Sequence, residues 1–302
     1  MEIEFKVVYL PENQGHGNAR RISVRECTNE LVALMDADDI SLPYRFEKQL
    51  AIFKKNKKVD IVGGQITEFI GEPTNIIGKR VVPVEDLDIK TYMKKRCPMN
   101  QVSVMFKKSF YEKVGGYVDW FCEEDYYLWL RMAENKGIFA NVPDILVNVR
   151  VGDEMSARRG GWKYFSSEVK LQNYMLKKQI ISFSRYLYNV AIRFVGEIMV
   201  PNSVRTKLFK LMREKYKEET KTEVIVNKSD IVNERFPFSV AMCVYGEDNS
   251  EWFELALESI LKQTVKPKEI VLVVDGPIPN TIQKVIDKYN NFEKYKETSN
   301  AK

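Results

Sequence analysis

Cysteine and histidine are scarce in this chain. Its 302 residues include four cysteines and a single histidine, His16. The cysteines lie far apart, without a CxxC spacing, at Cys27, Cys97, Cys122 and Cys243. This distribution argues against a zinc cluster or a redox motif, and it favours reduced thiols in a cytoplasmic protein.

Long apolar runs are also missing. No stretch of about 18 uncharged apolar residues occurs, and the N-terminus lacks a basic segment followed by an apolar one, so we expect neither a membrane-spanning helix nor a signal peptide. No nucleic-acid recognition module or aromatic RNA motif is visible, which disfavours nucleic-acid binding. The 44% of hydrophobic residues is enough for a full core. The sequence therefore predicts a soluble globular protein.

The positive charge is concentrated in one region. Between Met155 and Lys217 there are 14 Lys or Arg residues against 3 Glu, and apolar residues recur at helical spacing. We expect a basic helical extension over residues 151–217, followed by a polar linker over 218–235. Two interpretations of the extension stay open. Its charge is either an ordinary solvated surface or a surface that docks on anionic lipid at the inner face of the cell membrane.

Strand-like runs alternate with helical patterns in two separate blocks of the chain. In the first block we expect strands at 5–9, 31–35 and 59–63, and helices at 19–27 and 45–55. In the second block we expect a strand at 238–245, a helix at 252–262 and a strand at 269–274. Such alternation implies a largely parallel, doubly wound sheet, which we expect the two blocks to share. A further apolar run predicts a strand at 102–106.

Carboxylates follow the most apolar of these strands. The run 31–35 leads directly into Asp36, Ala37, Asp38 and Asp39. Open α/β sheets bind their ligands at the carboxyl ends of the strands, and carboxylate oxygens suit Mg²⁺ or Mn²⁺ held together with substrate phosphates. We therefore expect a metal and phosphate site here, with Asp39 capping a helix that begins near Leu42.

Four motifs together resemble a known family. They are NQGHGNARR at 13–21, DADD at 36–39, CEEDYYLWLR at 122–131 and RVGDEMSARRGG at 150–161. In these motifs the chain resembles family 2 inverting glycosyltransferases, closest to the bacterial enzymes that build capsular and extracellular polysaccharide. The resemblance implies the GT-A fold, a Rossmann-like α/β architecture with a mostly parallel sheet flanked by helices.

The order of the segments differs from that of the family. Family members open with a segment like 238–245, its helix and the strand that ends in Asp275, whereas here that unit lies near the C-terminus. We interpret the chain as a circular permutant, in which residues 1–150 and 236–302 form one catalytic domain. Most relatives carry Val-Asp-Asp-Gly-Ser where this chain has VDGP at 274–277, so only Asp275 is carried over as a base-recognition residue.

The resemblance also implies roles for individual residues. Asp125 is the expected catalytic base, Glu124 is expected to orient the acceptor or an arginine, and Glu123 is expected to be solvated. Asp38 is the expected ligand of Mn²⁺ or Mg²⁺. The expected nucleotide-sugar contacts are Asn13, Gly15, Arg20, Asp36, Arg158, Val244, Tyr245 and Asp275.

We therefore expect transfer of a hexose, with inversion, from a nucleotide sugar such as a UDP-sugar to a hydroxyl of a growing saccharide, for which a lipid-linked acceptor is one candidate. An alternative is a sugar-phosphate nucleotidyltransferase, although residues 245–249 carry one glycine and no lysine where such an enzyme needs a glycine-rich phosphate loop with lysine. A noncatalytic binding protein is a third hypothesis.

Overall fold

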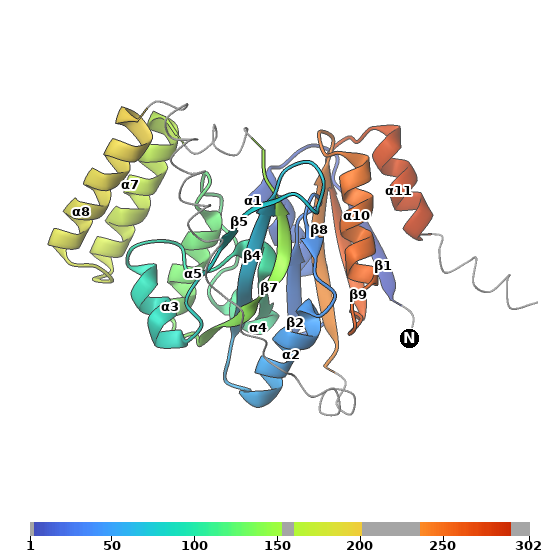
Figure 1. Cartoon of the computed structure of the whole chain (residues 1–302), viewed down its shortest axis with the longest axis horizontal. Coiled ribbons are helices and arrows are strands. Elements are labelled where there is room, and N and C mark those ends of the chain that lie inside the picture. The colour runs from blue at the N-terminus through green and yellow to red at the C-terminus, as the bar shows by residue number, and fades with distance from the viewer. Residues whose placement is uncertain (1–2, 153–159, 201–235, 291–302) are drawn as a thin grey trace, which may run out of the picture.

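The computed structural model describes residues 3–152, 160–200 and 236–290, and the statements below refer to these residues. A nine-stranded sheet forms the centre of the molecule (Figure 1). Its strands are β1 Glu4–Tyr9, β2 Leu31–Met35, β3 Ile40–Ser41, β4 Ile61–Phe69, β5 Ile76–Arg80, β6 Met105–Lys107, β7 Phe139–Arg150, β8 Phe238–Tyr245 and β9 Glu269–Asp275. The helices are α1 His16–Glu26, α2 Arg45–Lys55, α3 Asp86–Met93, α4 Lys108–Lys113, α5 Glu124–Glu134, α7 Trp162–Lys177, α8 Phe183–Phe194, α10 Ser250–Leu261 and α11 Asn280–Asn290.

The two blocks of the chain share this sheet, as the sequence predicts. The strand order is β1-β9-β8-β2-β6-β4-β7-β3, with β5 paired to β4. The pairs β1/β9, β9/β8, β8/β2 and β4/β7 are parallel, whereas β6 runs antiparallel to both β2 and β4. The β8–α10–β9 unit thus lies between β1 and β2, and it brings the carboxyl ends of four parallel strands to one edge.

Helices cover both faces of the sheet because side chains alternate along each buried strand. In β2, Leu31, Ala33 and Met35 pack with α2, α10 and α11. Val32 and Leu34 point to the opposite face, where they pack in a core with α3, α5 and α7. All five residues of β2 are buried, which is why this strand reads as a continuous apolar run.

The expected strand at 102–106 is wrong in part. Residues Gln101–Ser103 form a 3₁₀ turn instead, and only Met105–Lys107 form a short antiparallel strand. The turn is held by the hydroxyl of Ser103, which donates to the carbonyl of Asn100 at 2.7 Å. Strand β4 is longer than expected, because it continues to Phe69 and pairs along its length with β7.

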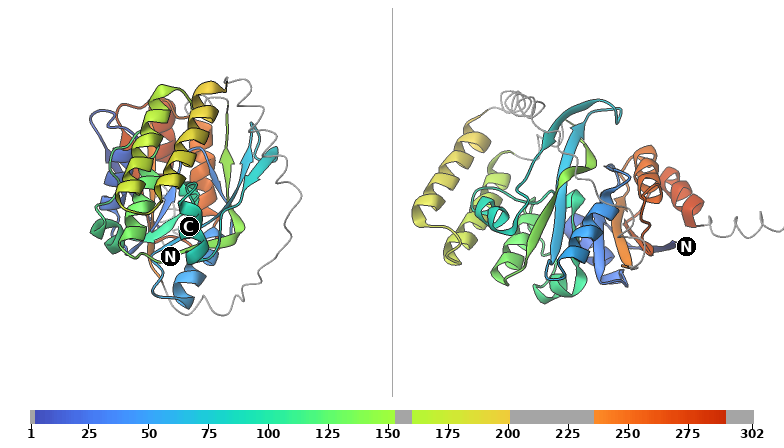
Figure 2. Two further views of the ribbon diagram at one scale, coloured as in Figure 1. Left: turned by 90° about the vertical axis from the view of Figure 1, so that its left-hand side faces the viewer. Right: turned by 60° about the horizontal axis from the view of Figure 1, so that its bottom comes forward.

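The basic region forms a helical hairpin. Helices α7 and α8 lie side by side at one end of the molecule, with α8 farthest from the sheet (Figures 1 and 2). Helix α7 packs on α5 through the T-shaped pair of Tyr174 and Tyr127, whose ring centroids lie 4.9 Å apart. Among the described residues, no helix has the length and apolar character that crossing a bilayer requires. The remainder of the predicted extension and the linker 218–235 lie outside the described residues.

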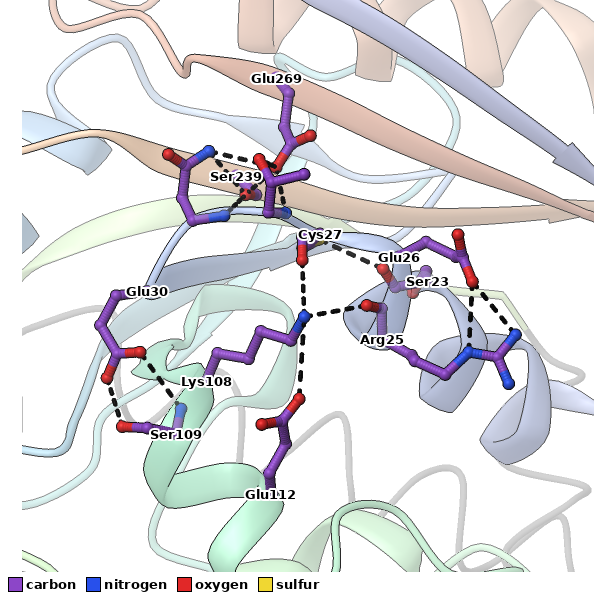
Figure 3. Close-up of polar contacts among 12 residues, drawn as sticks. Ser23, Arg25, Glu26, Cys27, Glu30, Lys108, Ser109, Glu112, Ser239 and Glu269 are labelled. Carbon is purple, nitrogen blue, oxygen red and sulfur yellow. Dashed lines mark hydrogen bonds and ion pairs between the residues drawn. The ribbon is translucent and has the colours of Figure 1, made fainter.

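A buried carboxylate ties the two blocks together at the edge opposite the carboxyl ends of the parallel strands. Glu269, the first residue of β9, accepts hydrogen bonds from the backbone N–H of Thr28 at 2.6 Å, from Asn29 at 3.1 Å and from Ser239 at 2.5 Å. These bonds hold the pKa of Glu269 below its usual value, although burial acts to raise it. Nearby, Lys108 donates to the carbonyl of Cys27 at 2.6 Å (Figure 3).

Candidate active site

One buried arginine connects three of the sequence motifs. Arg20, on α1, is 5% exposed, and its Nη2 lies 2.6 Å from Oδ1 of Asp36 at the end of β2. Its Nη1 lies 3.7 Å from Oε1 of Glu124 at the start of α5. The charge of Arg20 holds the pKa of Asp36 below its usual value against the opposing effect of burial. The expected contacts Arg20, Asp36 and Glu124 are therefore brought together.

The loop before α1 reaches the end of β9. The backbone N–H of Gln14 donates to Oδ1 of Asp275 at 2.7 Å. Asn13 stabilises the same loop, because its Oδ1 accepts from the backbone N–H of Gly15 at 3.0 Å. Gly15 has φ +84°, a conformation that favours glycine just before the helix begins. Asp275 therefore joins the motif at 13–21 despite the long separation in sequence.

Gly276 allows this close approach. Its φ is +85°, and a Cβ atom built there would lie 2.6 Å from the backbone nitrogen of Asn13. Only glycine fits both the dihedral angle and the space. The glycine in VDGP thus brings the chain after β9 into contact with the loop at 13–15.

Asp38 and Asp39 occupy different environments. Burial, together with repulsion from Asp36, raises the pKa of Asp38 to about 6. The expected capping role of Asp39 is wrong: α2 begins at Arg45 with Tyr44 as its cap, and Asp39 is buried and accepts from the backbone N–H of Arg150 at 2.9 Å. The short strand β3 comes between the acidic turn and α2, which removes Asp39 from the helix start.

Asp36, Asp38 and Asp248 lie at the carboxyl ends of β2 and β8, which we call the acidic edge. Asp248 and two arginines beside it, Arg150 and Arg45, received no individual role in the sequence analysis. Asp248, in the loop after β8, has its pKa raised to about 7 by burial and by the carboxylates of Asp38 and Asp36. Arg150 donates through Nε to the carbonyl of Asp38 at 3.2 Å. Arg45 is fully buried behind the turn and donates to the carbonyl of Leu34 at 2.6 Å. No sequence signal marks Asp248, because its proximity arises only when β8 pairs with β2.

Helix α5 presents Glu124 of its acidic first turn to this edge, where it lies beside Arg20. Oδ1 of Asp125 accepts from the backbone N–H of Tyr126 at 2.6 Å, and the Cys97 thiol lies 3.9 Å from Oδ2. Burial and the neighbouring Asp125 raise the pKa of Glu124 to about 7. The expected solvation of Glu123 is wrong, because it is 4% exposed and burial, together with the charge of Glu168, raises its pKa.

Two more expected contacts lie at the end of β8. Val244 is buried and Tyr245 is 38% exposed. Tyr245 pairs in register with Asp275 of β9, and its backbone N–H donates to Oδ2 of Asp248 at 2.9 Å. Arg158 lies outside the described residues.

The acidic edge has the composition of a site with few protein ligands. Within the described part of the chain, no group of three or more His, Cys, Asp or Glu side chains is placed to enclose a metal ion. Asp38 and Asp248 nevertheless carry raised pKa values, because burial disfavours their charged forms, as does the charge of Asp36 on Asp38 and the charges of Asp38 and Asp36 on Asp248. A divalent cation would relieve that repulsion, and Mg²⁺ commonly uses one or two carboxylates together with substrate phosphates. The residues present therefore fit such a cation.

Comparison with known proteins identifies the family. The model of glycosyl transferase family 2 matches residues 1–114. An uncharacterized glycosyltransferase of Haemophilus influenzae is 38% identical over 208 residues, which cover 69% of this chain and 77% of that protein. The chain belongs to glycosyltransferase family 2. Its mixed sheet flanked by helices is the GT-A-like architecture that we expected, and these matches give the nucleotidyltransferase alternative no support.

Two other relatives carry further information. The UDP-Gal:alpha-D-GlcNAc-diphosphoundecaprenol beta-1,3-galactosyltransferase of Escherichia coli is 34% identical over 208 residues, covering 69% of this chain and 75% of that enzyme. An uncharacterized glycosyltransferase of Rickettsia conorii is 25% identical over 284 residues, covering 89% of this chain and 43% of that protein. A stretch of that length includes parts of both blocks.

Proposed function

We propose that this glycosyltransferase moves a hexose from a UDP-sugar to a hydroxyl of a growing saccharide, with inversion at the anomeric carbon, in cell-surface polysaccharide biosynthesis. The contacts of Arg20 carry this proposal, because they join the DADD turn and the acidic start of α5 to the helix that follows the 13–15 loop. A donor held by the DADD turn and the 13–15 loop would lie beside a base at the start of α5. The name of the Escherichia coli relative supports the choice of UDP.

Asp125 is the proposed catalytic base. Its carboxylate is oriented by the N–H of Tyr126 and by the Cys97 thiol, whose pKa burial and the charge of Asp125 raise, so that the sulfur keeps its proton. In the proposed step, Asp125 takes the proton of the acceptor hydroxyl while the acceptor oxygen bonds to the anomeric carbon. The bond from that carbon to the diphosphate oxygen breaks, and the nucleoside diphosphate leaves with the electron pair.

The donor would lie along the carboxyl ends of β8, β9 and β2. In this proposal, Asp275 and the backbone at Val244 and Tyr245 hold the uracil, whereas Asp36 contacts the ribose. The 13–15 loop supplies backbone groups beside the nucleotide. Arg20 neutralises Asp36, which permits an anionic donor to approach an edge that is otherwise acidic.

Asp38 is the proposed ligand of Mn²⁺ or Mg²⁺, with Asp248 close enough to contribute its negative field. When bound, the cation would offset the charge that develops on the departing diphosphate. Arg150 and Arg45 position the turn that carries Asp38, because Arg150 donates to the backbone carbonyl of Asp38 and Arg45 donates to that of Leu34.

A donor screen tests the proposed function. We expect UDP-sugars, with Mn²⁺, to raise the melting temperature more than GDP- or dTDP-sugars, because a ligand of the folded form stabilises it. We also expect slow release of UDP, which Asp38→Asn abolishes and the exposed control Asp88→Asn leaves unchanged. Absence of both stabilisation and cleavage with every nucleotide sugar would overturn the proposal. Release of pyrophosphate from a nucleoside triphosphate would indicate the nucleotidyltransferase.

Inversion is tested on the product. With an active donor and a saccharide acceptor, we expect nuclear magnetic resonance to show the anomeric configuration opposite to that of the donor. A product that keeps the donor configuration would contradict a single displacement assisted by Asp125.

We further propose that the chain is a circular permutant of the family's catalytic domain, residues 1–150 with 236–302. The insertion of β8 and β9 between β1 and β2 supports this interpretation. We expect a rearranged chain, with residues 236–290 joined through a short linker to residue 3, to melt at the same temperature and to bind the same donor. A rearranged chain that fails to fold, while the original folds, would contradict the proposal.

The proposed place of action is the cytoplasm, with peripheral contact at the inner face of the cell membrane. Support comes from the name of the Escherichia coli relative, whose acceptor carries a diphosphoundecaprenol lipid. Cell fractionation tests the location: we expect the protein with the cytosol and with membranes, and release from membranes by high salt. Recovery with neither fraction would contradict the proposal.

A further inference from the structure

Helix α8 turns polar residues inward. Asn189 is 2% exposed and donates to the carbonyl of Lys94 at 3.0 Å and to the side chain of Gln172 at 2.8 Å. Arg193 Nε donates to Oε2 of Glu168 at 2.5 Å. Helix α8 is therefore anchored to α7 and to the end of α3 by buried polar bonds, where a helix of a soluble protein usually places apolar side chains.

The outward face of α8 is apolar. Tyr188 and Ile192 lie one turn apart on α8, and the apolar side chains Val195 and Met199 follow in the π-helical turn Val195–Met199. Their exposed fractions are 57%, 53%, 49% and 64%. Phe183 and Leu187 are also exposed on this helix. Contiguous apolar surface of this kind marks a site of interaction with a partner or a membrane.

The position of the face leaves it open to the outside. Helix α8 lies at the outer edge of the hairpin, and it ends at the same end of the molecule as the carboxyl ends of the parallel strands (Figures 1 and 2). Trp162, at the start of α7, is 67% exposed, and its ring centroid lies 6.2 Å from that of Phe194. The aromatic residues thus gather at the end of the hairpin nearest the acidic edge.

The charge of the hairpin identifies the partner. From Trp162 to Met199 there are six Lys or Arg residues and two Glu. Arg193 is paired with Glu168 and Lys178 with Glu134 of α5, so the excess of cations rests on the other four. Apolar and aromatic side chains beside an excess of cations are typical of helices that lie in the interface of an anionic bilayer. A face for a second copy of this chain would place the like charges of two hairpins side by side.

We propose that the outer face of α8, with Trp162, docks on an anionic lipid surface. This inference rests on the proposed function in one respect, namely that a lipid-linked acceptor would be presented at that surface. The docking orients the acidic edge toward the membrane, so that a lipid-linked saccharide reaches Asp125 without leaving the bilayer.

Vesicle sedimentation tests the proposal without substrate. We expect the protein to bind vesicles made of an equal mixture of phosphatidylcholine and phosphatidylglycerol. Vesicles of pure phosphatidylcholine should bind at least about tenfold more weakly. The double variant Ile192→Ser, Met199→Ser should lose roughly tenfold or more of the binding to anionic vesicles. The control Leu87→Ser changes a residue of α3 that is 75% exposed, and it should bind as the wild type does.

Four further measurements separate the alternatives. The double variant should keep its melting temperature and its transfer to a soluble acceptor, and anionic vesicles should shift the tryptophan fluorescence of the wild type to the blue more than that of Trp162→Phe. Wild-type protein that ignores anionic vesicles would overturn the proposal. A double variant with a lower melting temperature would also overturn the proposal, because the face would then be covered by another part of the chain. The same holds for a double variant that changes only the oligomeric state in ultracentrifugation, because the face would then bind a second copy. Vesicle binding, tryptophan fluorescence, melting and oligomeric state do not depend on the identity of the donor.

Discussion

Replacing Asp38 by asparagine should stabilise the protein while it removes its activity. Burial and the neighbouring Asp36 raise the pKa of Asp38 from 3.8 to about 6. Because the pKa is raised in the folded state, ionisation of Asp38 costs the folded state nothing below about pH 3.8 and its full amount above about pH 6. One pKa unit corresponds to about 1.4 kcal/mol, so the full cost is about 3 kcal/mol.

An asparagine of the same shape carries no charge and so avoids this cost. Its amide is also buried, however, and burying it offsets part of the stabilisation. We expect a net rise in the free energy of unfolding of about 1–2 kcal/mol at pH 8, which corresponds to roughly 3–6 °C in melting temperature. The gain should be smaller at pH 4.5, where the carboxyl of the wild type is mostly protonated in the folded state.

Differential scanning fluorimetry at the two pH values measures this effect, with Asp88→Asn as the exposed control. Mn²⁺ with UDP should then reverse the order of the proteins at pH 8, because only the wild type gains stability from binding. A variant that melts below the wild type at pH 8, or one that Mn²⁺ and UDP still stabilise, would refute the assignment of Asp38 as a repelled carboxylate that binds the metal.

Three further predictions concern other parts of the structure. Asp125→Asn should lower kcat about 10²–10⁴-fold with little change in donor binding, whereas a role in folding alone would show as a lower melting temperature. Glu124, with its pKa raised to about 7, should give the activity of the free enzyme a pH dependence near neutrality that is absent in Glu124→Gln, and an unchanged pH profile would exclude it from that role. Gly276→Ala should destabilise the protein by about 1–3 kcal/mol or more in denaturant unfolding, because it forces a Cβ to within 2.6 Å of Asn13 at a φ of +85°, and a neutral result would mean that the 13–15 loop moves freely.

Glu269→Gln would test how the two blocks are held together. Thr28, Asn29 and Ser239 all donate to Oε1 of Glu269, so an amide can keep these bonds, but it loses the negative charge that strengthens them and buries an NH2 group in place of Oε2. We expect a loss of about 1.5–3 kcal/mol at pH 7. Because the pKa of Glu269 is lowered in the folded state, its contribution is present above about pH 4.5 and is lost as pH falls through the folded pKa.

The sequence by itself determined the main strands and the chemistry of the motifs. The run Leu31–Met35, the helix Arg45–Lys55 and the strand Phe238–Tyr245 have the bounds expected from their apolar patterns, because buried strands and amphipathic helices impose periodicities that are local in the chain. The acidic turn was found because it directly follows an apolar strand, whereas the roles of the residues at the start of α5 came from the resemblance of their motif to the family. The family followed from those motifs and was confirmed by comparison.

Only the tertiary structure decided which carboxylates interact. Asp248 and Arg45 show no local signal. The effect of Asp38 on the pKa of Asp248 arises from the pairing of β8 with β2, and the hydrogen bond of Arg45 to the carbonyl of Leu34 arises from the packing of α2. Asp39 and Glu123 were assigned to the wrong environments for the same reason: burial depends on the elements that pack over a residue, which its neighbours in sequence do not reveal. The tertiary structure likewise decided that α8 turns the polar side chains of Asn189 and Arg193 toward the protein and leaves apolar side chains exposed.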